Sequence, residues 1–223
     1  MTQPLTRAEV FVLYALEIGA LELLPEGRKL KNGRISPYFF NSGLFNTGEA
    51  MNEIASAYAV AIEDGRIESY SVLYGPPYKG TILAPAVAMV LNDTFGYGAI
   101  RFCSSRKEEK GHGEGGVLIG SPIKKGDHVV IIDDVITDGG TKREAVELIR
   151  YYKGEVAGLV VAFDRQERGS GNLSAIQEFR REFDIPVYAV ATLADLISVI
   201  KKTGCADDEL LVKILDYQAE FGV

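Results

Sequence analysis

The sequence predicts an α/β fold in which a mainly parallel central sheet is flanked by helices. From Tyr70 onward, short apolar segments alternate with amphipathic helical segments, which is the pattern of a parallel sheet joined by right-handed crossovers. One expected strand, Val156 to Phe163, is hydrophobic on both faces, as in a strand buried inside such a sheet. The chain has 223 residues, 47% of them hydrophobic, which is enough for one domain with a large core.

The N-terminal part predicts a helix, a hairpin and a second helix. Thr6-Arg7-Ala8-Glu9 has the spacing of a capping box and starts a helix from about Thr6 to Ala20. Asn32-Gly33 predicts a tight turn between two short strands. Thr47 caps the second helix, whose apolar stripe consists of Met51, Ile54, Ala55, Tyr58 and Ile62.

The rest of the chain predicts alternating strands and helices in one domain. We expect strands at Ser71 to Tyr74, Ala99 to Cys103, Val117 to Ile119, Val129 to Asp133, Val156 to Phe163 and Val187 to Ala191. We expect helices at Gly80 to Leu91, Thr141 to Tyr152, Leu173 to Phe183, Thr192 to Lys201 and about Asp207 to Phe221. Pro85 is expected in the first turn of its helix, where a missing N–H costs little.

Composition excludes several classes of protein. Acidic residues number 31 and basic residues 24, and the resulting net charge of −7 argues against a nucleic-acid binder. Two cysteines, Cys103 and Cys205, favour a reducing cytoplasm over a disulfide scaffold. The N-terminus lacks the layout of a signal peptide, and no apolar run is long enough for a membrane span. We therefore expect a cytoplasmic protein without nucleic-acid or membrane partners.

The segment from Val129 to Thr141 carries the clearest chemistry. A buried strand ends in two adjacent carboxylates, and a glycine pair with flanking threonines then opens a helix. Ligands bind at this edge of open α/β sheets, and backbone N–H groups at a helix N-terminus favour a phosphate. The carboxylates suit ribose hydroxyls, or a divalent cation through its water shell. This combination predicts a phosphorylated sugar as ligand; the alternative is a strand ending in a solvated turn.

Asp133 to Thr141 resembles the signature with which type I phosphoribosyltransferases bind 5-phospho-α-D-ribose 1-diphosphate (PRPP), in the form found in the orotate phosphoribosyltransferases. Four other segments resemble that family in the right order. They are the N-terminal segment Lys31 to Asn41, the pyrophosphate loop Gly75 to Gly80, the lid Arg106 to Gly116 and the base-side loop Asp164 to Gly169. Five motifs in order make the resemblance specific.

The resemblance implies a type I phosphoribosyltransferase fold, with one domain over 1–223, a small hood over about 1–45 and a mobile lid over 104–116. It implies transfer of the phosphoribosyl group from PRPP to orotate in UMP biosynthesis, giving orotidine 5′-monophosphate and diphosphate. It also implies Mg²⁺, held mainly through PRPP and water rather than by direct protein ligands. Finally, it implies a homodimer whose lid reaches the partner's active site.

Site residues follow from the matching positions. The resemblance implies that Lys110, Asp133 and Asp134 are catalytic, with Lys110 as the catalytic lid lysine. The implied PRPP-binding residues are Lys31, Tyr78, Lys79, Arg106, Lys107, Lys110, His112, Asp133, Asp134, Val135, Ile136, Thr137, Asp138, Gly139, Gly140 and Thr141. The implied orotate-binding residues are Phe39, Phe40, Thr137 and Arg165.

Several of these residues have a plainer interpretation. Arg165 follows a buried strand at its ligand-binding end, and a guanidinium can fork onto the orotate carboxylate, but a surface ion pair with Asp164 or Glu167 is the alternative. Phe39 and Phe40 alternate in a strand, so one should face inward and one outward. Residues 104–116 hold little apolar area, so we expect a mobile segment; the alternative is a merely solvated charged loop. Residues 75–80 could equally form a structural turn.

The chain also departs from the family pattern. After Thr137 the family commonly has a small residue, a glycine and a hydroxyl residue, whereas this chain has Asp138-Gly139-Gly140-Thr141. Asp138 brings a negative charge near the phosphate and Gly140 removes a hydroxyl donor, so the departure bears on which residues bind the phosphate and not on the expected activity. Two alternative functions stay open: a phosphoribosyltransferase for another nucleobase, and a non-catalytic regulator that senses PRPP.

Overall fold

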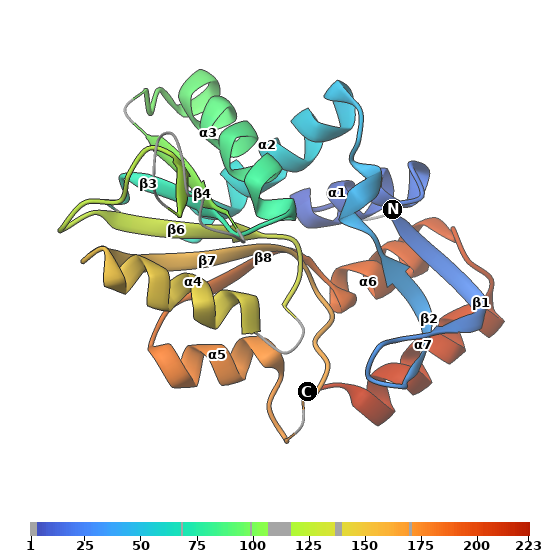
Figure 1. Cartoon of the computed structure of the whole chain (residues 1–223). Coiled ribbons are helices and arrows are strands. Elements are labelled where there is room, and N and C mark those ends of the chain that lie inside the picture. The colour runs from blue at the N-terminus through green and yellow to red at the C-terminus, as the bar shows by residue number, and fades with distance from the viewer. Residues whose placement is uncertain (1–3, 68, 99, 107–116, 137–139, 170) are drawn as a thin grey trace.

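The computed structural model describes residues 4–67, 69–98, 100–106, 117–136, 140–169 and 171–223. Its centre is a six-stranded sheet in the order β5-β4-β3-β6-β7-β8, with a separate two-stranded sheet of β1 and β2 to one side (Figure 1). Neighbouring strands of the large sheet are parallel except for β4 and β5. The predicted α/β fold with a mainly parallel sheet is therefore confirmed.

Most elements lie within a few residues of their predicted positions. The strands of the large sheet are β3 (Val72–Gly75), β4 (Arg101–Ser105), β5 (Leu118–Gly120), β6 (His128–Asp133), β7 (Glu155–Asp164) and β8 (Val187–Thr192). The helices are α1 (Arg7–Glu17), α2 (Gly48–Asp64), α3 (Lys79–Phe95), α4 (Gly140–Tyr151), α5 (Ala175–Phe183), α6 (Leu193–Thr203) and α7 (Asp208–Phe221). As predicted, Thr6, Thr47 and Thr192 are N-caps whose side chains accept a backbone N–H of the first turn, and Asp207 caps α7 in the same way.

Two layers of helices cover the large sheet. Helices α4 and α5 lie on one face, and α2 and α3 lie on the other (Figure 1). Successive residues of β6 belong to different cores: Val130 packs in the cluster that includes α2 and α3, and Val129 in the cluster that includes α4 and α5. Because both faces are covered, the central strands are apolar throughout, which is the signal that predicted a parallel sheet.

The small sheet confirms the predicted hairpin. β1 (Leu21–Lys29) and β2 (Ile35–Phe40) are antiparallel, and the turn between them contains Gly33 at φ +88°. The Gly33 N–H donates to the Leu30 carbonyl at 2.9 Å. The sequence did not predict that the first strand begins at Leu21, because Pro25 and a register shift between Leu23 and Arg28 interrupt its pattern.

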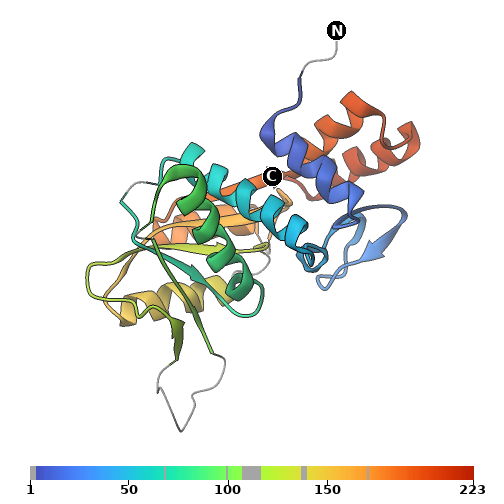
Figure 2. The same ribbon diagram turned by 90° about the horizontal axis from the view of Figure 1, so that it is seen from above.

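The C-terminal helix α7 packs against this hairpin, and we call the two together the hood. The Tyr217 ring meets the Tyr38 ring edge-on with centroids 6.0 Å apart, and the Arg34 guanidinium lies 4.7 Å from the centre of the Phe221 ring. Helices α1, α6 and α7 gather beside the hairpin at one end of the molecule (Figure 2). The region is thus built from both ends of the described chain, whereas the sequence predicted only its N-terminal part.

The predicted position of Pro85 was wrong. Helix α3 begins at Lys79, so Pro85 lies in the helix interior rather than in the first turn. A proline there removes one helical hydrogen bond to the preceding turn. The helix continues because Leu83, Ala84 and Val87 are buried around it, and this packing outweighs the local cost.

The segment predicted as a lid begins later than expected. Ser104 and Ser105 belong to β4, where they pair with Ile119 and Leu118 of β5, and Ser104 is buried. Residues 107–116 lie outside the described residues, so the mobility of the lid stays a prediction. Within the described ranges, no helix is both long enough and apolar enough to cross a bilayer.

A buried ion pair joins α1 to α6. The Glu9 carboxylate is 3% exposed, accepts the Ser198 hydroxyl at 2.5 Å, and lies 2.7 Å from the Lys202 ammonium. Hydrogen bonds from Lys202, Ser198 and the Thr6 backbone lower the pKa of Glu9 from 4.5 to about 2. The N-terminal helix is therefore fastened to the domain by a charge that persists in mild acid.

We expect Glu9→Gln to lower the midpoint of thermal unfolding at pH 7. Because the pKa of Glu9 is depressed in the folded state, its contribution is present above about pH 4.5 and is lost as the pH falls through about 2. The difference between variant and wild type should therefore shrink in scanning calorimetry below pH 4. Glu209→Gln, which breaks an exposed pair with Lys213, is the control and should change little. An equal effect of both variants would contradict the prediction.

Candidate active site

Three neighbouring parallel strands deliver the predicted motifs to one edge of the sheet. The loop Gly75 to Gly80 follows β3, the acid pair Asp133 and Asp134 ends β6, and Arg165 follows β7. The strand order places β6 between β3 and β7. From β3 the chain adds β4 on one side and later β6 on the other, so β3 and β6 flank a topological switch point. Ligands of open α/β sheets bind outside the carboxyl ends of the strands at such a point.

The predicted pyrophosphate loop is closed by two glycines. A side chain on Gly75 would lie 1.9 Å from the Gly80 carbonyl oxygen, and one on Gly80 would lie 2.6 Å from the Ile132 carbonyl oxygen. Only glycine fits at either position, and the loop therefore packs directly against β6. Tyr78 and Lys79 are exposed where α3 begins.

Asp133 is held by a lysine from the next helix. Its side chain is 7% exposed, and Oδ2 lies 2.6 Å from the Lys142 ammonium on α4, which is itself 9% exposed. The other oxygen accepts the Asp134 backbone N–H at 2.9 Å. Burial raises the pKa of the Asp133 carboxyl above its usual value, although Lys142 opposes the shift. Asp133 is thus a buried, paired acid rather than a solvated turn residue.

Asp134 faces the other way, toward the start of α2. Its Oδ2 accepts the Ser42 hydroxyl at 2.9 Å, and its Oδ1 accepts the Val135 backbone N–H at 2.8 Å. Ser42 opens the short 3-10 helix η1 (Ser42–Leu44) that follows the hairpin. A cavity of about 430 Å³ adjoins this contact, lined by Ser42, Asn46, Thr47 and Lys79 among others. The cavity therefore joins Ser42, the partner of Asp134, to Lys79 at the end of the pyrophosphate loop.

On the base side, the Asp164–Gly169 loop interlocks with the hairpin. The Arg165 guanidinium lies 4.3 Å from the centre of the Tyr38 ring. One of its nitrogens, Nη2, donates to the Ser36 hydroxyl at 2.9 Å and to the Tyr217 hydroxyl at 3.4 Å, and pairs with Glu167 at 2.5 Å. Burial lowers the pKa of Arg165, but Tyr38 and Glu167 outweigh it and raise the pKa above its usual value.

The alternative for Arg165, an ion pair with Glu167, is present, but the pair is not on the surface. The side chains are 16% and 9% exposed. Within the described part of the chain, the Arg165 side chain donates all of its hydrogen bonds from Nη2, so Nε and Nη1 donate none there. Half of the guanidinium fork therefore stays available to a ligand.

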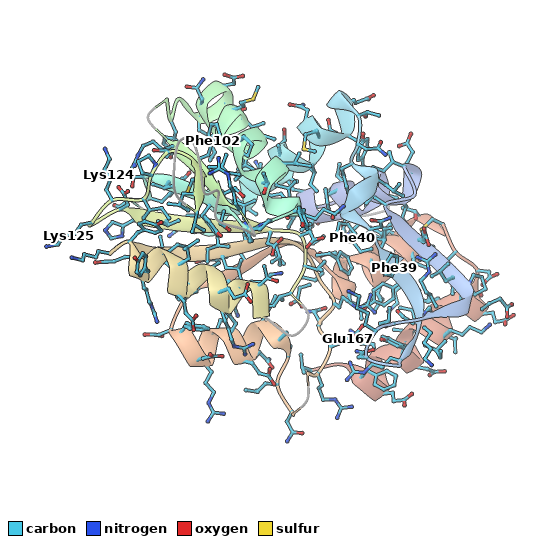
Figure 3. All side chains as sticks on the ribbon, in the orientation of Figure 1. Phe39, Phe40, Phe102, Lys124, Lys125 and Glu167 are labelled. Atoms are coloured by element: carbon cyan, nitrogen blue, oxygen red, sulfur yellow. The ribbon has the colours of Figure 1, made fainter. Side chains whose placement is uncertain are left out.

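Phe39 and Phe40 divide as the strand pattern predicted. Phe40 is buried and stacks on Phe163 with ring centroids 5.5 Å apart. Phe39 faces outward beneath the Arg28 guanidinium, 4.5 Å from its ring centre. Figure 3 shows both rings and Glu167 on the hood side of the sheet. The Phe40 ring is thus a core residue, and the predicted contacts of this segment with orotate stay predictions.

The remaining predicted residues fall into two groups. Lys31 is exposed at the hairpin turn, and Arg106 follows β4. Val135 and Ile136 follow β6, and Gly140 and Thr141 form the start of α4. Six predicted residues lie outside the described residues: Lys107, Lys110, His112, Thr137, Asp138 and Gly139. The predicted phosphate cradle and catalytic lid lysine are among these six.

Sequence reasoning missed the residues that hold the predicted ones. Lys142 pairs with Asp133, Ser42 binds Asp134, and the Tyr58 hydroxyl donates to the Asp133 carbonyl at 2.6 Å. Lys142 could have been found from the sequence, because it is a charged residue at a position of the inward-facing, otherwise apolar stripe of a helix that follows the acid pair. Ser42 and Tyr58 are distant in sequence and carried none.

Comparison with known proteins agrees with this geometry. A family model of the phosphoribosyl transferase domain matches residues 44–175. The chain is 44% identical over 214 residues to orotate phosphoribosyltransferase of Pseudoalteromonas translucida, covering 96% of both, and equally identical to that of Aliivibrio fischeri, covering 96% of this chain and 97% of the relative. The crystal structure of orotate phosphoribosyltransferase from Francisella tularensis superposes with a TM-score of 0.85 at 32% identity, covering 96% of this chain and all of that chain.

The mainly parallel sheet with an acid pair at its switch point, together with the domain match, is that of a type I phosphoribosyltransferase. Within that class, the chain belongs to the orotate phosphoribosyltransferase family.

The pairing of Asp133 with Lys142 predicts a stability effect. Lys142→Met leaves a buried carboxylate without a partner, which should lower the free energy of unfolding by about 3–5 kcal/mol in urea titrations. Adding Asp133→Asn removes the second charge and should recover most of the loss. If Lys142→Met alone unfolds like wild type, the two side chains do not depend on each other.

Proposed function

We infer that this protein transfers the phosphoribosyl group of PRPP to orotate, giving orotidine 5′-monophosphate and diphosphate in pyrimidine biosynthesis. The observation that carries this inference is the order of loops along the sheet edge. A glycine-closed loop with Lys79 follows β3, and an acid pair follows β6. A guanidinium follows β7, and two of its nitrogens have no partner among the described residues. These three groups would meet the diphosphate, the ribose and the carboxylate of the base, respectively. Their order along the sheet edge is the order in which these parts lie in the reacting complex, where the ribose is between the diphosphate and the base.

The ribose and phosphate side would act through electrostatics. Displacement at the anomeric carbon develops positive charge on the ribose, and the carboxylates of Asp133 and Asp134 would stabilise that charge. Asp134 is the more accessible of the two. Residues 137–141 would hold the 5′-phosphate through backbone amides at the start of α4. Lys79, Lys107 and Lys110 would stabilise the departing diphosphate, with Lys110 as the catalytic lid lysine. The remaining PRPP contacts predicted from the sequence belong to this proposal.

Mg²⁺ would assist the diphosphate. The cation prefers oxygen ligands and keeps several of its waters, so a substrate diphosphate and one carboxylate suit it. The Asp134 carboxylate, half-buried beside the cavity at Ser42, fits that role through bridging water. In the described ranges no three His, Cys, Asp or Glu side chains gather as a metal site. When bound, Mg²⁺ would neutralise charge that develops on the leaving diphosphate.

Base selection would rest on Arg165. The orotate carboxylate can form a bidentate pair with a guanidinium, and uracil lacks that group. Arg165 is buried and oriented by Ser36, Tyr38 and Glu167, and its Nε and Nη1 hold no partner in the described residues. Phe39, Phe40 and Thr137 would contact the ring, as the resemblance implies.

We further propose that the protein is a homodimer whose lid reaches the partner's active site. An apolar stripe on α3 supports this, because Tyr78, Ile82 and Met89 are 70%, 57% and 67% exposed and share one face of the helix. The stripe begins at the pyrophosphate loop, so a second copy packed there would lie next to the site. A cytoplasmic location, proposed from the cysteine content, fits the free thiols of Cys103 and Cys205.

One assay tests the function. Purified protein with PRPP and Mg²⁺ should consume orotate, followed by its ultraviolet absorbance, and should leave uracil and adenine unchanged. Turnover of another base instead would favour the alternative phosphoribosyltransferase. Binding of PRPP in calorimetry without turnover of any base would favour the regulator.

Arg165→Ala should raise the KM for orotate by at least about tenfold, because a charge-assisted hydrogen bond to the substrate is lost. The KM for PRPP should stay within about twofold, since Arg165 lies on the base side of the sheet edge. Steady-state kinetics with each substrate varied in turn measures both. Equal losses for the two substrates would contradict the assignment.

Shared active sites predict complementation between inactive subunits. Lys110→Ala and Asp134→Asn homodimers should each turn over slowly. After mixing and subunit exchange, about a quarter of the sites should combine an intact lid with an intact acid pair and recover activity. Mixtures that stay as slow as their parents would show that each subunit uses its own lid.

A further inference from the structure

A single carboxylate lies between two guanidinium groups behind the candidate base site. Glu167 Oε2 is 3.2 Å from Nη1 of Arg34 on the loop that leads into β2, and Glu167 Oε1 is 2.5 Å from Nη2 of Arg165. The Tyr38 hydroxyl donates to Oε1 at 3.1 Å. The three charged side chains are 19%, 9% and 16% exposed for Arg34, Glu167 and Arg165. Two cations therefore share one anion in a largely desolvated place.

This cluster carries one excess positive charge. The nearest other acid of the loop, Asp164, accepts the Gln166 backbone N–H at 2.8 Å, and no ion pair joins it to Arg165 within the described residues. A buried charge without a full complement of partners favours binding of an anion. Arg34 has two partners besides Glu167, and within the described residues it donates through both Nη1 and Nη2, whereas Arg165 donates only through Nη2. The unused donors of the cluster therefore lie mainly on Arg165.

Those partners fix Arg34 in place. Its Nη2 donates to the Arg168 carbonyl at 2.9 Å, and its guanidinium stacks over the Phe221 ring of α7. Arg34 thereby engages Oε2 of Glu167, the oxygen that does not pair with Arg165. Glu167 is left with a single oxygen, Oε1, for Arg165, and of the Arg165 nitrogens this oxygen pairs with Nη2, beside the Tyr38 hydroxyl.

We propose that Arg34 is a positioning residue for orotate recognition: it restrains Glu167 to one contact with Arg165 and so reserves Nε and Nη1 of Arg165 for the substrate's carboxylate. Without Arg34, Glu167 keeps its contacts with the Tyr38 and Tyr217 hydroxyls but loses the cation that holds Oε2. Rotation of the carboxylate would let both oxygens face Arg165 in the bidentate geometry that guanidinium and carboxylate prefer. The protein's own carboxylate then competes with that of orotate. The proposal rests on the function inferred above.

The test is a pair of variants in which the second repairs the first. Arg34→Met should raise the KM for orotate by about tenfold or more, with the KM for PRPP within about twofold of wild type. Arg34→Met combined with Glu167→Gln should return the KM for orotate to within about threefold of wild type, because the competing charge is gone. A merely structural defect would weaken both substrates, so an unchanged KM for PRPP distinguishes the positioning of Arg165 from a general loss of structure.

Calorimetry of product binding gives a second readout. Arg34→Met should weaken orotidine 5′-monophosphate but leave uridine 5′-monophosphate unchanged, since only the former carries the carboxylate. Arg168→Met is the matched control: it removes a cation from the same loop that donates to the Glu220 carbonyl rather than to Glu167, and both ligands should bind as in wild type.

The outcomes separate the two levels of inference. If wild type does not turn over orotate, the proposed function fails. If wild type is active and Arg34→Met leaves the KM for orotate unchanged, or the double variant is as weak as Arg34→Met, the role of Arg34 is overturned. Should Arg34→Met not fold, Arg34→Lys replaces it. Lysine cannot reach Glu167 and the Arg168 carbonyl together, so a rise of about threefold is expected, and no rise in a folded Arg34→Lys protein overturns the proposal.

Discussion

Charges that the fold removes from water must find partners, and this requirement shapes the protein at every point where its parts are joined. Glu9 and Lys202 fasten the first helix to α6, and Asp133 and Lys142 fasten the end of β6 to α4. On the base side, Glu167 serves two arginines at once. The first two pairs are balanced and therefore structural. The third is not balanced, and an unbalanced buried charge is where a substrate of opposite charge can contribute the missing partner.

The sheet explains why the three loops of the candidate site lie in the observed order. Parallel strands deliver their carboxyl ends to one edge, and the switch point between β3 and β6 leaves room there for a ligand. The close packing of Gly75 and Gly80 against the Ile132 carbonyl draws the first loop onto the strand that carries the acid pair. Loops on adjacent strands, about 5 Å apart in a sheet, can then meet consecutive groups of one extended substrate.

The sequence predicted the sheet, the hairpin turn and the helix caps because each depends on local chemistry. Thr6 and Thr192 cap their own helices, and Asn32-Gly33 turns its own hairpin. Pro85 was misplaced because tertiary packing outweighs the local preference of proline for a first turn. Five motifs predicted the site, but the side chains that orient their members could not be predicted. Ser42 and Tyr217 reach Asp134 and Arg165 from segments whose proximity exists only after folding.

The two halves of the site therefore differ in how they are encoded. On the phosphate side, Asp133 and its partner Lys142 lie within one strand–loop–helix unit, so their pairing depends on one local segment. On the base side, Arg165 is held by Ser36, Glu167 and Tyr217. The backbone of Arg168 links the same loop to two other segments. Its carbonyl accepts the Arg34 guanidinium, and its N–H donates to the Phe221 carbonyl. Three distant segments must dock before Arg165 is oriented. Under the proposed role of Arg165, base choice would therefore depend on the assembled hood, and a change of base would require coordinated change in the hairpin, the loop after β7 and α7.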